Sequence, residues 1–506
     1  MEYQLSTGVW EITMACNMRC GHCGSHCTER LPGELETDDA LRLCDELAEL
    51  GLKRLTLSGG EPFMREDWPL ICKRLSEHDV TVNVISNGWL VDEELIDRAM
   101  GAGLVNIGMS LDGVEKTHDA LRRPGAFGRV LSALGVMQRR GYPATIVTTV
   151  IRDNLAELPE IQKILEDREV KCWQIQLGLP MGNLTKEEVI HPSQVEEVIS
   201  FAETLLEQSP VKPILADSIG YYTKKAVQLS ESYFGQSCGW LGCQAGKTNI
   251  GILHDGSIVG CTSIREPQFI EGNIRETSLH EIWTRPAAFA WNRELTKDDL
   301  TGFCGICHHG AYCLGGCSNT KLTITGGLTE NPYCAYRTGV ERLSRKIEHI
   351  HDVDTLIERA RKAETLQVYE IAEQCLSKAL TLEPENLTAL KLWGYTWFKL
   401  GDFSRCLEIN RKAVSIAPND AYVQKGLGVS LAKLGHVKEG VKALRKAIAF
   451  AASDFMDPYY DLAVIFLENN LAPKAVEILE EGRSRSVDFQ ATSEELYQHC
   501  LDALAK

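Results

Sequence analysis

Three cysteines close to the start of the chain have a spacing that can hold a metal cluster. Cys16, Cys20 and Cys23 follow an apolar segment, residues 9–14, and are arranged as C-x3-C-x2-C. Iron–sulfur clusters are normally bound by cysteine thiolates, and a four-iron cluster needs four of them. Three thiolates leave one iron with an open coordination position, the feature that distinguishes catalytic from structural metal sites. A zinc site or a group of buried thiols is the alternative interpretation.

A second motif favours the catalytic cluster. Gly59, Gly60, Glu61 and Pro62 follow the next predicted strand, and glycines allow a backbone to come close to a ligand. The cysteine spacing and this segment together resemble the radical S-adenosylmethionine (SAM) enzymes. The resemblance implies that the three cysteines bind a [4Fe–4S] cluster whose fourth iron is chelated by SAM. It also implies that the Gly-Gly-Glu-Pro segment binds the amino group of SAM.

Polar residues after later strands fit the same cofactor. The resemblance implies SAM contacts from Ser86, Asn87, Ser110, Asp112 and Arg122. Asp112 is alternatively a turn residue. Arg122 is alternatively paired with acidic groups near solvent, although a guanidinium suits the carboxylate of SAM. At the end of the sixth predicted strand, Gln176 or Leu177 either contacts SAM or packs in the core.

Two residues of the cysteine loop have no settled role. Cys27 follows at a further C-x3-C step, and we expect it to be a free loop thiol because a fourth protein ligand would block SAM. His22 stands where the family usually has an aromatic residue near the adenine. An imidazole at this position can stack or form a hydrogen bond.

Apolar segments alternate with amphipathic helical segments, which indicates a parallel sheet covered by helices. The predicted strands are Gly8–Met14, Arg54–Ser58, Thr81–Ser86, Val105–Leu111, Ala144–Ile151 and Cys172–Leu177. Six strands are too few to close a full (β/α)8 barrel. The fold class predicted for this region is therefore an α/β partial (β/α)6 barrel of the TIM type, as the resemblance also implies. Active residues should lie at the carboxyl ends of its strands.

The predicted helices of this region include Asp38–Leu50, Asp67–Glu77, Asp92–Ala102 and Leu155–Asp167. We expect Thr37 to be the N-cap of the first, because acidic residues follow it. Residues 191–231 are predicted to be connector helices with one apolar face. The barrel domain is thus expected to span residues 1–231.

A second group of cysteines lies in the next predicted domain, residues 232–350. It contains Cys238, Cys243, Cys261, Cys304, Cys307, Cys313, Cys317 and Cys334. Their spacing resembles the seven-cysteine SPASM extension of radical SAM enzymes, with Cys238 as an eighth thiolate. A hairpin formed by residues 250–253 and 257–259 is predicted to present Cys261.

Eight thiolates can close two auxiliary [4Fe–4S] clusters. The resemblance assigns Cys238, Cys243, Cys261 and Cys317 to the first, and Cys304, Cys307, Cys313 and Cys334 to the second. A pair of structural zinc sites is the alternative. His308 and His309 lie between ligands, where they either tune a cluster through hydrogen bonds or are exposed loop residues.

Residues 354–506 are predicted to be helical throughout and to repeat. Ala379 is matched by Ala413 and Ala447, and Gly394 by Gly428, each 34 residues further on. This period resembles the tetratricopeptide repeat (TPR). Such repeats stack into an all-α solenoid whose concave face suits an extended peptide or a partner protein. A dimerisation or stabilising role is the alternative.

Composition excludes several other classes of protein. No apolar run among the 506 residues approaches the length of a membrane span, and the first residues do not resemble a secretory signal. Eighteen cysteines without such a signal indicate a reducing compartment, which we expect to be the cytoplasm. The net charge is −17, of which −14 falls on the first 353 residues, so a nucleic acid substrate is not expected.

The resemblance implies that SAM is cleaved to a 5′-deoxyadenosyl radical, with an electron donor such as flavodoxin or ferredoxin. Auxiliary clusters favour a net oxidation, and SPASM-bearing relatives mostly modify peptides or proteins. We therefore expect a peptide or protein substrate that is crosslinked or dehydrogenated and that is docked by the repeats. The alternatives are modification of a small molecule such as a tetrapyrrole, and an electron-transfer scaffold. Thr262 after Cys261 departs from sulfatase-maturing relatives, which have aspartate there.

Overall fold

The computed structural model describes residues 3–223, 226–234 and 240–504. It divides into two compact units: Met1–Gly305 with His309–Gly339, and Ile306–His308 with Val340–Lys506. Among the helices of the described ranges, none combines the length and the apolar character needed to cross a membrane.

The first unit is built around one sheet, which has ten strands within the described residues. Their order is β10-β9-β8-β1-β2-β3-β4-β5-β6-β7. The six predicted strands are present and parallel in sequence order: β1 (Thr7–Thr13), β2 (Arg54–Gly59), β3 (Thr81–Ser86), β4 (Leu104–Ser110), β5 (Ala144–Val150) and β6 (Cys172–Leu177). The prediction of a TIM-type α/β barrel is confirmed, although the sheet extends beyond six strands at both edges.

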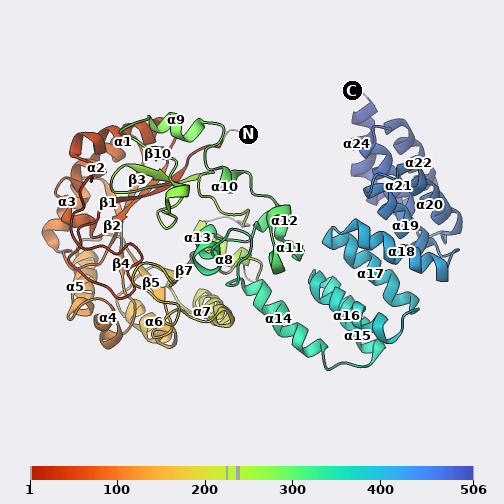
Figure 1. Cartoon of the computed structure of the whole chain (residues 1–506), viewed down its shortest axis with the longest axis horizontal. Coiled ribbons are helices and arrows are strands. Elements are labelled where there is room, and N and C mark those ends of the chain that lie inside the picture. Colours follow the sequence, from red (N-terminus) through yellow and green to blue (C-terminus); the bar gives the residue numbers. More distant parts are fainter. Residues whose placement is uncertain (1–2, 224–225, 235–239, 505–506) are drawn as a thin grey trace. The chain divides into compact units, whose positions relative to one another are not determined.

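Helices cover the outer face of these strands (Figure 1). They are α1 (Thr37–Glu49), α2 (Trp68–Glu77), α3 (Glu93–Gly101), α4 (Glu115–Leu121), α5 (Ala126–Arg139), α6 (Leu158–Asp167) and α7 (Val195–Gln208). Successive side chains of a strand point to opposite faces of the sheet. In β3, Val82 and Val84 pack in the core, whereas Ile85 lines a cavity. The predicted N-cap Thr37 is wrong. Glu36 is the N-cap, and the Thr37 hydroxyl instead donates to Asp67 Oδ2 at 2.7 Å.

The prediction of connector helices in residues 191–231 is confirmed for α7 and is wrong for the segment that follows it. After α7 comes a short strand, β7 (Lys212–Leu215), which pairs in parallel with β6. The helix α8 (Ala226–Phe234) follows. This four-residue strand contains Pro213, which has no N–H to donate, and such strands are confined to sheet edges. β7 extends the sheet at the end opposite β10.

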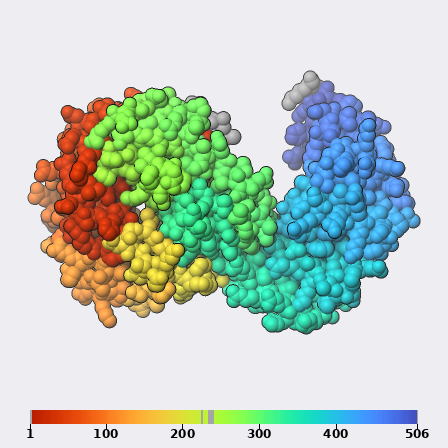
Figure 2. Space-filling model, in the orientation of Figure 1, coloured from red at the N-terminus to blue at the C-terminus, as the bar shows by residue number. Residues whose placement is uncertain are grey.

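The predicted hairpin is present and continues the barrel sheet. β8 (Asn249–Ile252) and β9 (Ser257–Val259) are antiparallel, and β8 pairs in parallel with β1. β10 (Gly272–Asn273) then pairs with β9. Figure 2 shows the surface of this green segment bordering the red surface of the first strands and helices. The remaining helices of the cysteine-rich part are α9 (Leu279–Thr284), α10 (Ala290–Arg293), α11 (Gly302–Ile306), α12 (Gly310–Cys313), α13 (Ser318–Thr325) and α14 (Ala335–Ile347).

The second unit is helical in all of its described elements after α14. These are α15 (Val353–Thr365), α16 (Tyr369–Leu382), α17 (Leu387–Leu400), α18 (Phe403–Ile416), α19 (Ala421–Lys433), α20 (Val437–Phe450), α21 (Asp457–Glu468), α22 (Ala472–Arg485), α23 (Val487–Thr492) and α24 (Glu494–Leu504). The pair α17 and α18 recurs 34 residues later as α19 and α20. This spacing is the one predicted, and the assignment to the TPR class stays a prediction.

Candidate active site

A cavity of about 350 Å³ lies at the carboxyl ends of the barrel strands. Cys16, Cys20 and Cys23, on the loop after β1, all line it and are half-buried. The lining also contains the following residues that were predicted to contact SAM: Gly59, Gly60, Ser86, Asn87, Ser110, Arg122, Gln176 and Leu177. The motifs that follow β1 to β4 and β6 are therefore brought together in one space, as expected for a barrel enzyme.

The cysteines of the loop differ in their surroundings. Burial raises the pKa of Cys16 to about 11, whereas the pKa of Cys23 is lowered to about 5, first by a hydrogen bond from the Cys27 thiol. Cys27 is buried against Cys23 and also lines the cavity. All cysteines in the described part of the chain are free thiols. Thiols that converge without forming disulfides suit a metal cluster, which binds them as thiolates.

The two glycines at the end of β2, Gly59 and Gly60, are required by the chain's own backbone. A Cβ on Gly59 would lie 2.2 Å from the carbonyl oxygen of Thr13, and a Cβ on Gly60 would lie 2.2 Å from that of Ala15. The same backbones are joined by hydrogen bonds of 2.8 Å from Gly60 N to Thr13 O and from Glu61 N to Ala15 O. The glycines thus allow the Gly-Gly-Glu-Pro segment to pack directly against the cysteine loop. This packing explains the need for glycine at both positions without a ligand.

Glu61 lies behind the cavity wall. Its carboxylate is 0% exposed and accepts hydrogen bonds from the Ser86 hydroxyl at 2.9 Å and from Asn87 N at 2.8 Å. Pro62 begins a short 3-10 helix and is also buried outside the lining. Burial raises the pKa of Glu61 from 4.5 to about 7. Glu61 therefore positions Ser86 and Asn87, which do face the cavity.

The raised pKa of Glu61 predicts a pH dependence of stability. Between pH 4.5 and 7 the folded protein holds the Glu61 proton more tightly than the unfolded chain does. Its contribution to stability therefore falls as the pH rises through this window, by on the order of 3 kcal/mol, and is constant on either side. Calorimetric melting temperatures of the protein without SAM should show this slope for the wild type and a smaller slope for Glu61→Gln.

A matched control is Glu160→Gln, because Glu160 is an exposed glutamate on α6. This variant should keep the wild-type slope. Equal slopes for the wild type and Glu61→Gln would show that Glu61 ionises as it does in water.

Asp112 forms a hydrogen-bonded pair with each of two side chains, Arg122 and His22. It is completely buried outside the cavity lining, and its Oδ2 lies 2.5 Å from Arg122 Nε and 3.1 Å from His22 Nε2. Its Oδ1 accepts a hydrogen bond from Thr149 N at 2.9 Å. Arg122 first, and then His22, hold the pKa of Asp112 well below its usual range against the effect of burial. Asp112 therefore positions two side chains that line the cavity.

The cavity has the donor set that a cluster and SAM require. Arg122 Nη1 lies 3.9 Å from the Cys20 Sγ, so the guanidinium cation is next to one of the three loop thiols. His22 Nδ1 is buried and has no hydrogen-bond partner among the described residues, although its ring lines the cavity. An unpartnered buried polar atom is costly unless a ligand supplies the partner. The residues present thus fit a [4Fe–4S] cluster with SAM, and His22 is placed to form a hydrogen bond.

Three cysteines of the SPASM region come together near the cavity. Cys243 precedes β8, Cys261 follows β9, and Cys317 precedes α13. Burial raises the pKa of Cys317, and the charges of Asp217, Cys243 and Cys261 add to this rise. These thiols therefore lie within electrostatic reach of one another. The fourth predicted ligand of this set, Cys238, lies outside the described residues.

A second set contains Cys304, Cys313 and Cys334. Burial raises the pKa of Cys313 to about 12, and Cys334 and Cys304 contribute further. The thiols whose charges act on Cys313 thus differ from those that act on Cys317, and the assignment of clusters to the two sets stays a prediction. The fourth member, Cys307, is buried and falls in the second compact unit.

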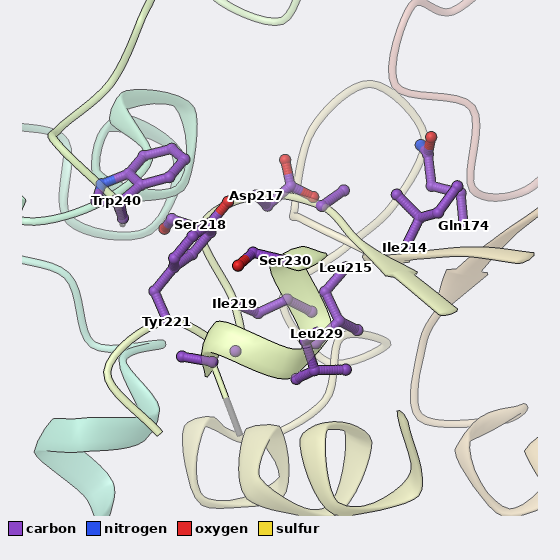
Figure 3. Close-up of a pocket in the computed structure, with 13 residues that line it drawn as sticks. Gln174, Ile214, Leu215, Asp217, Ser218, Ile219, Tyr221, Leu229, Ser230 and Trp240 are labelled. Carbon is purple, nitrogen blue, oxygen red and sulfur yellow. The ribbon is translucent and has the colours of Figure 1, made fainter. Parts of the chain in front are cut away.

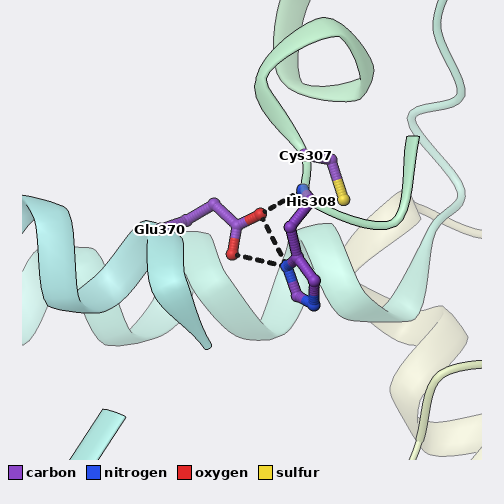
Figure 4. Close-up of side chains that lie close together, drawn as sticks. All are labelled: Cys307, His308 and Glu370. Atoms are coloured by element: carbon purple, nitrogen blue, oxygen red, sulfur yellow. Dashed lines mark hydrogen bonds and ion pairs between the residues drawn. The ribbon is translucent and has the colours of Figure 1, made fainter. Parts of the chain in front are cut away.

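Cys307 is followed by a histidine that is held by a buried glutamate (Figure 4). His308 N donates to Glu370 Oε1 at 2.8 Å, and His308 Nδ1 lies 3.1 Å from the same oxygen. The side chain of His308 is only 12% exposed, so the interpretation as an exposed loop histidine is wrong. One ligand atom from each of Cys307, His308 and Glu370 lies within 4.8 Å of the others.

Sequence reasoning missed several residues that line the cavity. Asp217, in the segment predicted to be helical, is half-buried and lines both this cavity and an adjoining one of about 310 Å³ (Figure 3). Burial raises its pKa to about 6. Arg265 pairs with the buried Glu11 at 2.9 Å, on the wall next to Cys261. No motif marked these positions, because their burial depends on how distant segments pack.

Comparisons with known proteins agree with this geometry. Residues 10–165 match the radical SAM superfamily, and residues 243–308 match the SPASM iron–sulfur cluster-binding domain. AdoMet-dependent heme synthase of Methanosarcina barkeri (strain Fusaro / DSM 804) is 30% identical over 341 residues, which cover 65% of this chain and 96% of that protein. PqqA peptide cyclase of Granulibacter bethesdensis (strain ATCC BAA-1260 / CGDNIH1) is 28% identical over 337 residues, covering 64% and 86%.

The fold is also similar to that of a solved structure, Streptococcus suis SuiB bound to S-adenosylmethionine. The TM-score is 0.53 at 15% identity, over 65% of this chain and 76% of that chain. At this identity the likeness concerns the fold.

Proposed function

Because the chain belongs to the radical SAM superfamily and carries a SPASM domain, we propose that it oxidises a side chain of a peptide or protein, by crosslinking or dehydrogenation. The cofactors are SAM, a [4Fe–4S] cluster with an open iron, and auxiliary iron–sulfur clusters, which together supply a 5′-deoxyadenosyl radical and an internal electron acceptor. We expect a low-potential donor such as flavodoxin or ferredoxin. The free thiols suit the reducing cytoplasm.

In this proposal, each part of the cavity has a defined task. Cys16, Cys20 and Cys23 hold the open cluster, while Arg122 and His22 orient SAM beside it. The two sets of SPASM cysteines hold the auxiliary clusters, with Cys238 and Cys307 as their fourth members. Asp217 is the carboxylate we expect to accept a proton from the substrate, because it lines the cavity and its charge acts on Cys261 and Cys317.

The observation that carries the choice of a polypeptide is a pocket in the helical second unit. It has a volume of about 160 Å³ and is formed by α17, α18, α19 and α21. Tyr395, Phe398 and Tyr422 line it together with Lys391 and Lys425. Both lysines are ion-paired, Lys391 with Asp420 and Lys425 with Asp457, so the pocket offers a peptide chiefly its aromatic side chains, which bind through large, rigid contacts. A relative named PqqA peptide cyclase also supports this substrate class.

A second candidate is the oxidation of a tetrapyrrole. It is favoured by the 30% identity to an AdoMet-dependent heme synthase that the alignment covers almost completely. That alignment leaves about a third of the present chain unmatched. In this case the helical unit would bind a partner protein.

One experiment separates the two candidates. Reconstituted protein is reduced with dithionite and given SAM with either a peptide encoded beside the gene or a tetrapyrrole, and substrate masses are followed. We expect the peptide to lose two hydrogens and the tetrapyrrole to stay unchanged. Tyr395→Ala with Tyr422→Ala should lower the rate at limiting peptide about thirtyfold, since the two aromatic contacts are worth roughly 1 kcal/mol each.

Tyr460→Ala is the matched control, because Tyr460 is 39% exposed on α21 and does not line the pocket. It should react as the wild type does. Oxidation of the tetrapyrrole with no change in the peptide would establish the second candidate instead.

A further inference from the structure

A lysine is completely buried beside the SPASM cysteines. Lys321, on α13, is 0% exposed, and its Nζ donates a hydrogen bond to the carbonyl oxygen of Leu314 at 2.8 Å. Across the part of the chain that the structure describes, no carboxylate forms an ion pair with it. Burying an ammonium without a counter-charge costs several kcal/mol. A negative charge close to Lys321 would offset this cost.

The charges that act favourably on this ammonium are those of thiols. Burial lowers the pKa of Lys321, and the charges that oppose this effect are those of Cys243, Cys304, Cys313 and Cys317. The first and last of these belong to the first set of cysteines, and the other two belong to the second set. One cation thus lies within electrostatic reach of both predicted cluster sites.

The loop that joins the two sets, residues 314–316, is shaped around this lysine. Leu314 and Gly315 have φ angles of 50° and 75°, in the left-handed region that costs a non-glycine residue about 1 kcal/mol. This conformation directs the Leu314 carbonyl to the ammonium. A Cβ on Gly315 would lie 3.0 Å from Lys321 Cδ, so a side chain there would crowd the lysine.

We propose that Lys321 is the shared counter-cation of the two auxiliary clusters and raises the reduction potential of both. The inference rests on the cluster ligands of the proposed function. A four-iron cluster held by four thiolates is negatively charged and becomes more negative on reduction, so a fixed cation nearby favours the reduced form. Raised potentials at both clusters favour removal of an electron from the substrate radical.

The test is a redox titration of the full-length protein with reconstituted clusters, followed by electron paramagnetic resonance. Lys321→Met removes the charge while keeping most of the side-chain length. We expect the reduction equilibrium constants of both auxiliary clusters to fall at least tenfold, which is about 59 mV for a one-electron couple. The SAM-binding cluster should be unchanged, and Lys321→Arg should stay within threefold of the wild type.

Lys247→Met is the matched control, because among the SPASM thiols Lys247 is influenced by Cys243 alone. It should leave the second cluster unchanged. Unaltered potentials in Lys321→Met, or a change at only one auxiliary cluster, would overturn the inference.

If Lys321→Met loses iron, the arginine variant decides the matter. Clusters that are retained in Lys321→Arg support a role of the charge, whereas loss of the same iron in both variants overturns it. A wild-type protein with about four irons per chain in place of about twelve would contradict the auxiliary clusters themselves, and with them the proposed function.

Discussion

Replacing Cys16, Cys20 and Cys23 together by alanine is expected to remove one four-iron cluster per chain and to abolish formation of 5′-deoxyadenosine. The three thiols converge on the cavity that also holds Arg122 and His22, so their loss removes every predicted protein ligand of the open cluster. The SPASM cysteines are not altered, and about eight irons per chain should remain. Iron analysis, electron paramagnetic resonance and chromatography of the SAM products measure these quantities on one sample.

Cys27→Ala is the control within the same loop. Cys27 is buried against Cys23, and its hydrogen bond lowers the pKa of Cys23. We expect this variant to keep its full iron content and to form 5′-deoxyadenosine. If it instead lost the same four irons as the triple variant, Cys27 would be a ligand and the open coordination position would not exist.

Asp112→Asn is expected to destabilise the first unit by about 3–5 kcal/mol, because it leaves the buried Arg122 without its counter-charge. Asp112 is 0% exposed, and the Arg122 side chain is only 11% exposed. The amide can still accept the hydrogen bond from Thr149 N, so the change isolates the effect of charge. Calorimetry of the full-length protein measures the loss as a lower melting temperature of the first unit.

The same pair allows a double-variant test. Adding Arg122→Met to Asp112→Asn removes the uncompensated cation and should recover part of the stability, because neutral replacement of both partners of a buried pair is often tolerated. Asp45→Asn is the control, since Asp45 pairs with Arg74 at 2.6 Å with both side chains more than 30% exposed. It should change stability little. A loss in Asp112→Asn as small as that in Asp45→Asn would refute the counter-charge role.

The barrel was predictable because each of its first six strands is an apolar segment between amphipathic helices. Thr81–Ser86 and Cys172–Leu177 were predicted with their observed bounds. The strand Lys212–Leu215 was missed, since it is short, contains a proline and lies between polar segments. The pairing of Asn249–Ile252 with Thr7–Thr13 was also missed, because nothing local specifies which distant strand a hairpin joins.

The candidate site was predictable where spacing carries chemistry and was not where burial does. The cysteines and the Gly-Gly-Glu-Pro segment are recognisable as patterns along the chain. Lys321 and Asp217 are ordinary charged residues in the sequence. They become informative only because distant segments bury Lys321 and bring Asp217 into the cavity wall. His22 is intermediate: its position was noted, but its pairing with Asp112 required the structure.

The central claim is that this chain oxidises a polypeptide through a SAM-derived radical. Mass spectrometry of a peptide encoded beside the gene tests it most directly, after co-expression with the wild type or with the triple variant of Cys16, Cys20 and Cys23. We expect the peptide to lack two hydrogens after co-expression with the wild type and to be unmodified with the variant. An unmodified peptide in both cases, from cells in which the wild-type protein carries its clusters, would contradict the claim.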